Sequence, residues 1–359
     1  MEITYIEIRN VRNLDNEKLA PSPQLNIFFG NNASGKTSVL ESIYLLSVAR
    51  SFRTTHVKEV IQYNKESLQV FAKISNSLGD RTVPVGIERT SSKYKIKINN
   101  QNISNLADLS SLLPVQIINP DVHKLLEQGP KIRRQFLDWG VFHVEHVFLN
   151  TWKQYYRVLK QRNAALRAKQ IKDSVILWDN QLISLAKTIT LSREKYLQGI
   201  LPFLKEYIFE LLDLEVVFSY SRGWKKDSNL TDVLSEGFII DSQRGYTRNG
   251  PHRADLLITY NNVPVEHCFS RGQQKLLVCA MRLAQISYLK QHSNIVSIVL
   301  IDDLAAELDI EHRNKLLNLL FLTDAQLFIT ATEKNAFQLP QDKDIKMFHV
   351  EHGNVKEVV

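Results

Sequence analysis

The chain has 359 residues, of which 44% are hydrophobic and 23% are charged, and it carries a formal net charge of +7 with a pI near 9.2. This composition excludes a disordered chain, and the length allows one large domain or two of ordinary size. The positive charge favours a polyanionic partner but does not establish one.

The sequence shows no sign of export or of a membrane span. Glu2 and Glu7 interrupt the apolar residues at the N-terminus, and the longest apolar runs, such as residues 298–301, are only as long as a strand. Cys268 and Cys279 lack metal-ligand spacing, so we expect two buried free thiols in a reducing compartment. The expected location is the cytoplasm.

A phosphate-binding loop is predicted after the first 29 residues. The run 25–29 is apolar and has the length of a buried strand, and apolar residues at helical spacing occupy 39–49. Between them lies a G-x-x-x-x-G-K-[ST] motif, whose residues, with the serine that follows, are Gly30, Asn31, Asn32, Ala33, Ser34, Gly35, Lys36, Thr37 and Ser38. Strand, glycine-rich loop and helix in this order favour a nucleotide phosphate site over a chance turn.

Each part of this motif has a chemical reason. Gly30 and Gly35 allow the tight turns that let successive backbone N–H groups converge on phosphate oxygens. The helix after the loop directs its positive end at the same anion. Lys36 supplies a positive charge for the β- and γ-phosphates, and Thr37 supplies a hydroxyl for Mg²⁺.

Strands are predicted on both sides of the loop. Residues 3–9 alternate weakly, residues 10–23 are rich in turn formers, and residues 68–74 and 94–98 alternate clearly. The pair Asn99 and Asn100 predicts a hairpin turn. A row of lysines is predicted to solubilise the edge of this meander in preference to contacting DNA: Lys93, Lys95 and Lys97. A further strand, 115–118, stops at Asn119-Pro120.

A helical block is predicted from about residue 121 to residue 214. Its helices include 150–172, 175–199 and a last one that Pro202 begins. The first of these has an apolar stripe of Trp152, Tyr155, Tyr156, Leu159 and Leu166. A second face carries the candidate DNA-binding residues Lys153, Arg157, Lys160 and Arg167. This basic row is either a solvated helix face or a contact to the phosphate backbone.

Strand patterns return at 214–220 and 255–260, and the second is followed by an Asn261-Asn262 turn. We therefore predict one α/β lobe made of residues 1–120 and 215–359, with a helical lobe of residues 121–214 inserted into it.

The second half of the predicted site follows a buried strand, 295–301, which ends in Asp302 and Asp303. Ligands of open α/β sheets bind at the carboxyl ends of the strands. Asp302 is the candidate Mg²⁺ ligand, and Asp303 is the candidate residue to orient or deprotonate the attacking water. The alternative is an ordinary strand-end aspartate that caps a loop. A helix containing Leu316, Leu317 and Leu320 and a strand at 325–332 follow.

A second anion-binding helix terminus is predicted at residues 269–275. Ser270 is an N-cap type of residue, Gly272 permits close backbone approach, and a helix with apolar residues from Leu276 onward follows. One subunit cannot easily present two helix termini to opposite sides of one γ-phosphate, whereas two facing subunits can. Ser270, Gly272 and Gln273 are therefore candidates to contact a nucleotide held by a second copy of the chain.

These residues resemble a known family. The run 270–274 resembles the ABC signature and lies about 30 residues before the acidic strand, as is usual in that superfamily. Glu307-Leu308-Asp309 resembles the D-loop. Together with the runs 50–53, 129–140 and 250–253, these motifs resemble RecF, the family of bacterial recombination mediators, nearly from end to end.

The resemblance implies the fold and the activity. The fold would be α/β, with a P-loop ABC-type ATPase lobe like an SMC head, an inserted and mainly helical second lobe, and no long coiled coil. The chain would bind ATP and Mg²⁺, form an ATP-dependent homodimer, and clamp DNA at single-strand gaps and junctions. It would act with RecR and RecO to help load RecA during DNA repair, replication and the SOS response.

Three departures from the pattern of ABC proteins qualify the expected activity. Arg271 occupies a signature position that is often glycine, and Thr330 and Thr332 occupy the strand where a switch histidine is expected. Asp303 stands where most ABC ATPases have glutamate. Its shorter reach predicts slow hydrolysis suited to a switch, and the resemblance implies that DNA stimulates this hydrolysis. For the Q-loop, Gln116 and the loop at Asn119 are both open candidates.

Two other functions are considered. A P-loop kinase of small molecules would need an acceptor pocket and a lid, and it would not explain the Ser270 motif. A structural DNA-binding module with a vestigial ATP site is the other alternative.

Overall fold

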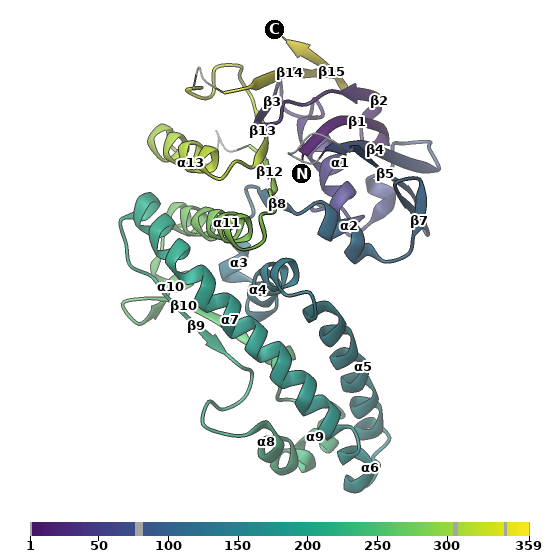
Figure 1. Ribbon diagram of the computed structural model, residues 1–359, viewed down its shortest axis with the longest axis vertical. Coiled ribbons are helices and arrows are strands. Elements are labelled where there is room, and N and C mark those ends of the chain that lie inside the picture. The colour runs from purple at the N-terminus through teal and green to yellow at the C-terminus, as the bar shows by residue number, and fades with distance from the viewer. Residues whose placement is uncertain (1, 76–81, 304–307, 341–342, 359) are drawn as a thin grey trace. The chain divides into compact units, whose positions relative to one another are not determined.

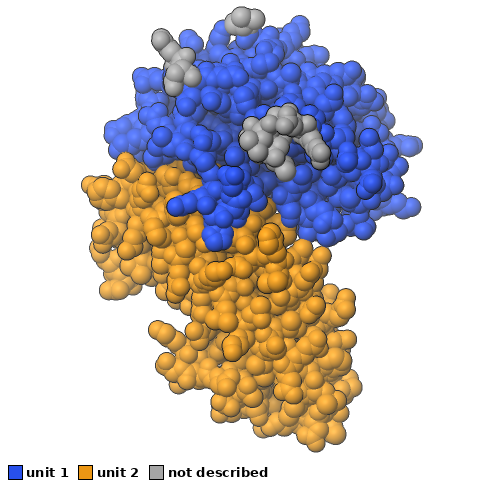
Figure 2. All heavy atoms as spheres, viewed as in Figure 1, with its two compact units in different colours: residues 1–122, 289–359 blue, residues 123–288 orange. Residues whose placement is uncertain are grey.

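The computed structural model describes residues 2–75, 82–303, 308–340 and 343–358. It divides into two compact units (Figure 2): unit 1 comprises residues 1–122 and 289–359, and unit 2 comprises residues 123–288. The chain therefore leaves unit 1 once and returns to it near its end, so unit 2 is an insertion.

The place of this return differs from the sequence expectation. The chain leaves unit 1 after residue 122, against a predicted 120, but it returns at 289 and not at 215. Residues 215–288 contribute three strands to unit 2, which pair in the order β11-β10-β9 as a separate sheet: β9 (Val217–Ser221), β10 (Asp255–Tyr260) and β11 (Val263–Pro264). A strand pattern does not indicate which sheet a strand joins. For that reason the predicted boundary at 215 differs from the observed return at 289.

Unit 1 is built on a six-stranded sheet in the order β15-β14-β3-β13-β12-β8 (Figure 1). Five of its strands are parallel neighbours, and β15 pairs antiparallel with β14. The strands are β3 (Leu25–Phe29), β8 (Val115–Ile118), β12 (Ile298–Ile301), β13 (Gln326–Ala331), β14 (Ile345–Glu351) and β15 (Asn354–Val358). The rings of Phe28, Phe328 and Phe348 stack across three neighbouring strands, with centroids 6.4 and 5.0 Å apart. The predicted strands at 25–29 and 115–118 are confirmed residue for residue.

A second six-stranded sheet in unit 1 is antiparallel, in the order β2-β1-β4-β5-β6-β7. Its strands are β1 (Glu2–Val11), β2 (Leu14–Leu19), β4 (Ser67–Ser75), β5 (Thr82–Thr90), β6 (Tyr94–Ile98) and β7 (Gln101–Ile103). The predicted Asn99-Asn100 hairpin turn is confirmed, with φ of 50° and 63°. Strand β2 was missed, because polar residues dominate the predicted turn region 10–23.

Helix α1 lies between the two sheets and contacts strands of both, including β1, β4, β12 and β13 (Figure 1). Because it is covered on several sides, its buried residues do not form a single stripe. Besides the end of the helix that enters it at residue 289, the described part of unit 1 has α1 (Lys36–Val48), η1 (Val57–Glu59), α2 (Leu106–Leu112) and α13 (Ile310–Leu322). The predicted helix with Leu316, Leu317 and Leu320 is confirmed as α13, and all three side chains are buried.

Unit 2 is mainly helical. Its helices are α3 (Lys124–Glu127), α4 (Pro130–Val144), α5 (Phe148–Arg167), α6 (Lys172–Ile176), α7 (Asp179–Leu212), α8 (Leu230–Glu236), α9 (Phe238–Arg244), η2 (Pro251–Arg253), α10 (Val265–Cys268) and α11 (Arg271–Ser293), whose C-terminal end belongs to unit 1.

The predicted break at Pro202 was wrong, because α7 runs through it as one helix of 34 residues. Proline removes one backbone donor from a helix interior. Buried Leu197, Ile200, Leu204 and Ile208 continue the same apolar stripe past it, so packing outweighs the lost hydrogen bond. Among the described residues, no helix is both long and apolar enough to span a membrane.

Candidate nucleotide-binding site

The predicted strand, loop and helix are present in unit 1: β3 ends at Phe29 and α1 begins at Lys36. Gly30 and Gly35 have φ of 149° and 121°, which L side chains rarely adopt. A side chain at Gly30 would overlap the carbonyl oxygen of Val350. The loop therefore needs glycine at both positions, for its own turns and for its close approach to β14.

Lys36 lies within this loop and is 8% exposed. Its Nζ donates hydrogen bonds to the carbonyl oxygens of Gly30, at 2.6 Å, and Asn31, at 2.8 Å. Burial lowers the pKa of Lys36, and the negative charges of Asp303 and Asp302 oppose that shift. The ammonium group of Lys36 is thus held by two backbone carbonyl oxygens of the loop. A bound phosphate could replace these oxygens as its hydrogen-bond acceptor.

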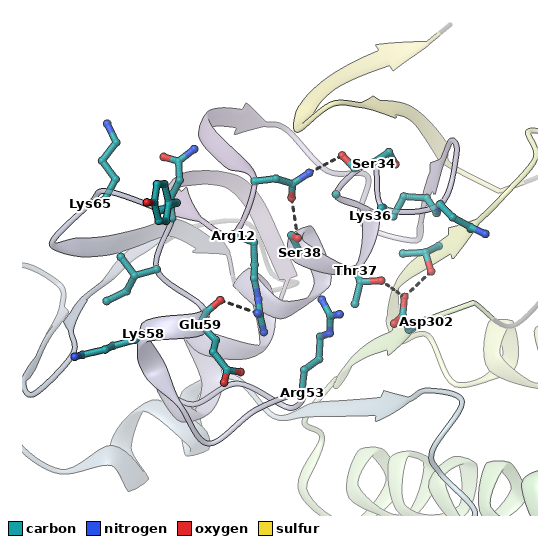
Figure 3. A pocket seen from close by; sticks show the side chains of 18 of the residues that line it. Arg12, Ser34, Lys36, Thr37, Ser38, Arg53, Lys58, Glu59, Lys65 and Asp302 are labelled. Atoms are coloured by element: carbon teal, nitrogen blue, oxygen red, sulfur yellow. Dashed lines mark hydrogen bonds between the residues drawn. The ribbon is translucent and has the colours of Figure 1, made fainter.

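Asp302 follows the C-terminal end of β12 and meets the start of α1. Its Oδ1 accepts hydrogen bonds from the hydroxyls of Thr37, at 2.9 Å, and Thr330, at 2.8 Å (Figure 3). Burial raises the pKa of Asp302, while the two hydroxyl donors lower it. The two candidate Mg²⁺ ligands, Thr37 and Asp302, are therefore in direct contact.

Asp303 is next along the chain and has a left-handed backbone, with φ of 54°. Its backbone N–H donates to the hydroxyl of Thr330 at 2.8 Å. Its Oδ1 is buried without a hydrogen-bond partner among the described residues, and the same is true of Oγ of Ser34 in the loop. Buried polar atoms normally have partners, so both atoms suit a site that is completed by a polar ligand.

A cavity of about 1060 Å³ lies over these residues, within unit 1. One part of its wall is the loop and the acidic strand end, and another part is formed by Lys58 and Glu59 of η1 and by residues 61–66 (Figure 3). Arg12, Asn13 and Arg53 also line it. Its size and its cationic and hydroxyl groups suit a nucleotide with several phosphates.

Sequence reasoning missed Arg12 and Asn13, which form the turn between β1 and β2. Arg12 donates through Nε and Nη2 to the fully buried carboxylate of Glu41, at 2.9 and 3.0 Å, and through Nη1 to the carbonyl of Glu59, at 2.6 Å. It thereby ties α1 to the segment that forms the cavity wall. In the sequence, apolar Val11 and Leu14 flank this polar pair, which is the signal that could have located a two-residue turn, and in the structure these two residues pair across it.

The Ser270 motif caps α11 in unit 2. Oγ of Ser270 accepts from the backbone N–H of Gln273, and Oε1 of Gln273 accepts from the N–H of Ser270, at 3.3 and 3.0 Å. This reciprocal arrangement is a capping box, which confirms the helix start expected at Ser270. Ser270, Arg271 and Gly272 are exposed. Cys268, just before them, is exposed too, contrary to prediction, and only Cys279 is buried.

The remaining predicted residues lie as follows. Lys153, Arg157, Lys160 and Arg167 are all exposed on α5. Both interpretations of that row require exposure, so both stay open. Gln116 is buried in β8, and the Q-loop stays unassigned. Glu307 of the expected D-loop lies outside the described residues, and Asp309 caps α13 by accepting from the N–H of His312 at 3.0 Å.

Comparisons with known proteins agree with one another. The family model described as the RecF/RecN/SMC N terminal domain matches residues 2–356. A protein of Pseudomonas paraeruginosa named "DNA replication and repair protein RecF" is 42% identical over 362 aligned residues, covering 99% of this chain and 98% of that protein. A protein of the same name from Shewanella woodyi is 41% identical over 358 residues, with the same coverage.

Solved structures show the same fold. The structure described as "recombination mediator protein RecF-ATP in RecFOR pathway" has a TM-score of 0.88 and 24% identity, covering 100% of this chain and 98% of that one. An Smc head bound to the C-terminal winged-helix domain of ScpA has a TM-score of 0.62 at 14% identity, covering 100% and 97%. The expected α/β ATPase fold of the SMC-head type is thus confirmed, and the chain belongs to the RecF family of RecF/RecN/SMC N-terminal-domain proteins.

Proposed function

We propose that this chain is an ATP-dependent DNA-binding protein of recombinational DNA repair and replication. The observation that carries the proposal is the 2.9 Å contact between Thr37 and Asp302, which joins the phosphate-binding loop to an acid 265 positions away in the sequence. Relatives 41–42% identical along almost their whole length are named DNA replication and repair proteins. Family membership excludes the small-molecule kinase.

The residues present fit Mg²⁺ and ATP. Thr37 and Asp302 offer adjacent oxygen ligands, which Mg²⁺ prefers. No group of three or more His, Cys, Asp or Glu side chains able to hold a metal occurs in the described part of the chain. A magnesium ion held by Thr37 and Asp302 would complete its shell with phosphate oxygens and water, and would neutralise phosphate charge.

The other residues of the loop have separate tasks. Residues 30–38 bind the phosphates through backbone N–H groups, and Lys36 exchanges its two carbonyl partners for phosphate oxygens. Asp303 orients or deprotonates the attacking water with its unpartnered Oδ1. Because aspartate reaches less far than glutamate, we expect slow hydrolysis, which suits a switch.

Ser270, Gly272 and Gln273 are proposed to contact ATP held by a second copy of the chain. A Cβ added at Gly272 would have Oγ of Ser270, at 4.0 Å, as its nearest neighbour. Glycine costs about 1 kcal/mol relative to alanine inside a helix, and nothing else in the described part of this chain requires it there. A second copy of the chain that packs closely against Gly272 would explain why glycine occupies this position. The exposed glycine therefore supports an ATP-dependent homodimer.

The homodimer would clamp DNA, and hydrolysis would release it. A solved structure with the same fold is described as a recombination mediator of the RecFOR pathway. By that similarity, we propose RecR and RecO as partners and RecA as the protein loaded at single-strand gaps and junctions.

Sedimentation of the protein with ATP, with ADP and without nucleotide tests the switch. We expect dimers with ATP and monomers otherwise, because the dimer must bind ATP more tightly than it binds ADP. Ser270→Arg should abolish pairing while each monomer still binds ATP. Equal association under all three conditions would contradict the proposal, and loss of ATP binding by the Ser270→Arg monomer would argue against contact in trans.

The remaining alternative function is a structural DNA-binding module whose ATP site is vestigial. Lys36→Arg keeps the positive charge but changes its shape, and it should abolish ATP-driven pairing and repair in cells. Repair at the wild-type level by this variant would favour a purely structural DNA-binding module.

A further inference from the structure

Two hairpin turns from opposite ends of the sequence meet at one carbonyl oxygen of the phosphate-binding loop. The backbone N–H of Gly353 donates to the carbonyl of Ser34 at 2.8 Å. Nδ2 of Asn13 donates to the same oxygen at 2.9 Å (Figure 3). Asn13 belongs to the turn between β1 and β2, and Gly353 to the turn between β14 and β15.

The two donors fix the direction of the next peptide N–H. A trans peptide is planar, so the carbonyl of Ser34 and the N–H of Gly35 point in opposite directions. With the oxygen held by two donors, the N–H of Gly35 cannot rotate away without breaking both hydrogen bonds. Orienting successive N–H groups is what makes such a loop bind phosphate.

Asn13 also makes a hydrogen bond to a residue that follows Gly35 in the sequence. Its Oδ1 accepts from the hydroxyl of Ser38 at 3.0 Å, in the first turn of α1. One side chain therefore spans from the last loop carbonyl to the start of the helix, and it holds the segment between them, including Lys36 and Thr37.

The turn of the C-terminal hairpin has little freedom to move. Glu351 pairs with Asn354 around His352 and Gly353, whose φ values are 48° and 83°. A Cβ at Gly353 would overlap the backbone carbonyl of Asn13. The two hairpins are also joined where the N–H of Val355 donates to Oε2 of Glu17 at 2.9 Å.

We propose that Asn13 and Gly353 are positioning residues for the triphosphate, and that the β14–β15 hairpin acts as a brace for the phosphate-binding loop. They act through the loop, because their hydrogen bonds go to Ser34 and Ser38. This inference rests on the proposed ATP site and adds that its geometry is set by both ends of the chain.

Two variants test the brace. Asn13→Ala removes an exposed side chain and its two hydrogen bonds, and Gly353→Ala displaces the turn. We expect each to weaken ATP and ADP binding about five- to tenfold, as the loss of one or two hydrogen bonds predicts, measured by displacement of a fluorescent ATP analogue. The matched controls are Asn16→Ala and Lys356→Ala, exposed residues of the same two hairpins, which should bind like wild type.

Hydrogen exchange of the nucleotide-free protein provides a readout that does not depend on ATP. Exchange at residues 31–38 should become faster in both variants, while exchange in α7 stays at the wild-type rate. If Gly353→Ala does not fold, Asn13→Ala alone decides. Wild-type affinity together with wild-type exchange in Asn13→Ala would overturn the inference. A wild-type protein that binds no ATP would overturn the proposed function instead, and the exchange result would still test the brace.

Discussion

The hydroxyl of Thr330 donates a hydrogen bond to Oδ1 of Asp302, at 2.8 Å. The same hydroxyl accepts from the backbone N–H of Asp303, at 2.8 Å. A hydroxyl has one proton. Since the N–H of Asp303 can only donate, the hydroxyl of Thr330 accepts there and gives its proton to Asp302. Thr330 comes from β13, beside β12 in the sheet. One threonine thus holds the carboxylate of one acid and the backbone of the next, in the strand where a switch histidine was expected.

Thr330→Val should impair hydrolysis and leave nucleotide binding nearly intact. Valine has a similar shape but neither donates nor accepts, so Asp302 loses a donor and Asp303 loses the acceptor that fixes its backbone. We expect kcat to fall about ten- to a hundredfold, the usual scale for a misplaced catalytic group, with KM for ATP within about twofold. Steady-state phosphate release measures both. Thr330→Ser keeps the hydroxyl and should retain activity, and equal loss in both variants would contradict this role.

Gly272→Ala should stabilise the monomer and weaken the ATP-driven dimer. The added methyl group has open space within this chain, and alanine is the better helix former by up to about 1 kcal/mol. Thermal unfolding without nucleotide and sedimentation with ATP measure the two effects. A variant that dimerises normally would show that no second subunit approaches Gly272.

The basic row on α5 makes a quantitative prediction about salt. Each phosphate contact contributes about 0.9 to the slope of log affinity against log salt for duplex DNA. Replacing all four residues by alanine should therefore reduce that slope by up to about 3.6. These residues are Lys153, Arg157, Lys160 and Arg167. Binding titrations at several salt concentrations, with and without ATP, measure the slope.

Two controls accompany that experiment. Lys187→Ala and Lys205→Ala remove exposed lysines from α7, and they should leave the slope unchanged. Arg162, on α5 itself, is fully buried in ion pairs with Asp179 and Asp241, so it cannot serve as a control and is not a DNA contact. An unchanged slope in the fourfold variant would identify the row as a solvated face.

Unit 2 should lose stability in mild acid. Burial lowers the pKa of both His143 and His252 to about 4, from an ordinary 6.5. The unfolded chain then binds more protons than the folded one between pH 6.5 and 4, so stability is full above this window and falls as the pH decreases through it. The limit is about 1.4 kcal/mol per pH unit for each histidine.

Urea unfolding followed by tryptophan fluorescence tests this prediction, because all four tryptophans lie within residues 139–224, in unit 2. His252 is hydrogen-bonded to Tyr155 through Nδ1, at 2.7 Å, and to the carbonyl of Thr247 through Nε2, at 3.0 Å. The neutral ring thus donates from Nε2 and accepts at Nδ1. His143→Phe should flatten the pH dependence without disturbing these bonds, and an unaltered pH profile would count against the burial argument.

Most of the correct predictions came from patterns of residues that are close together in the sequence. The strand before the loop, the helix after it and the cap at Ser270 each depend on residues within a few positions of one another, and the structure contains all three. The strand preceding Asp302 was also recognisable, because a buried parallel strand is a continuous apolar run.

Contacts between distant segments could not be predicted in this way. In the sequence, Asn13 is an ordinary turn residue and Thr330 an ordinary strand residue. Their contacts to the loop and to the acids depend on segments that are distant in the sequence. Pro202 predicts a helix start because its local preference is strong, whereas the packing of α7 decided otherwise. The return to unit 1 at 289 likewise depends on which sheet the later strands join.

The split of unit 1 into residues 1–122 and 289–359 has a consequence for biosynthesis. A ribosome makes the phosphate-binding loop before unit 2, yet Asp302, Thr330 and Gly353 emerge only after the whole of unit 2. Unit 2, being one continuous stretch, can begin to fold while the nascent protein is still incomplete. Translation that stops before these residues would leave a helical unit attached to a loop without Asp302, Asp303 and Gly353, and we expect such a product to bind ATP poorly.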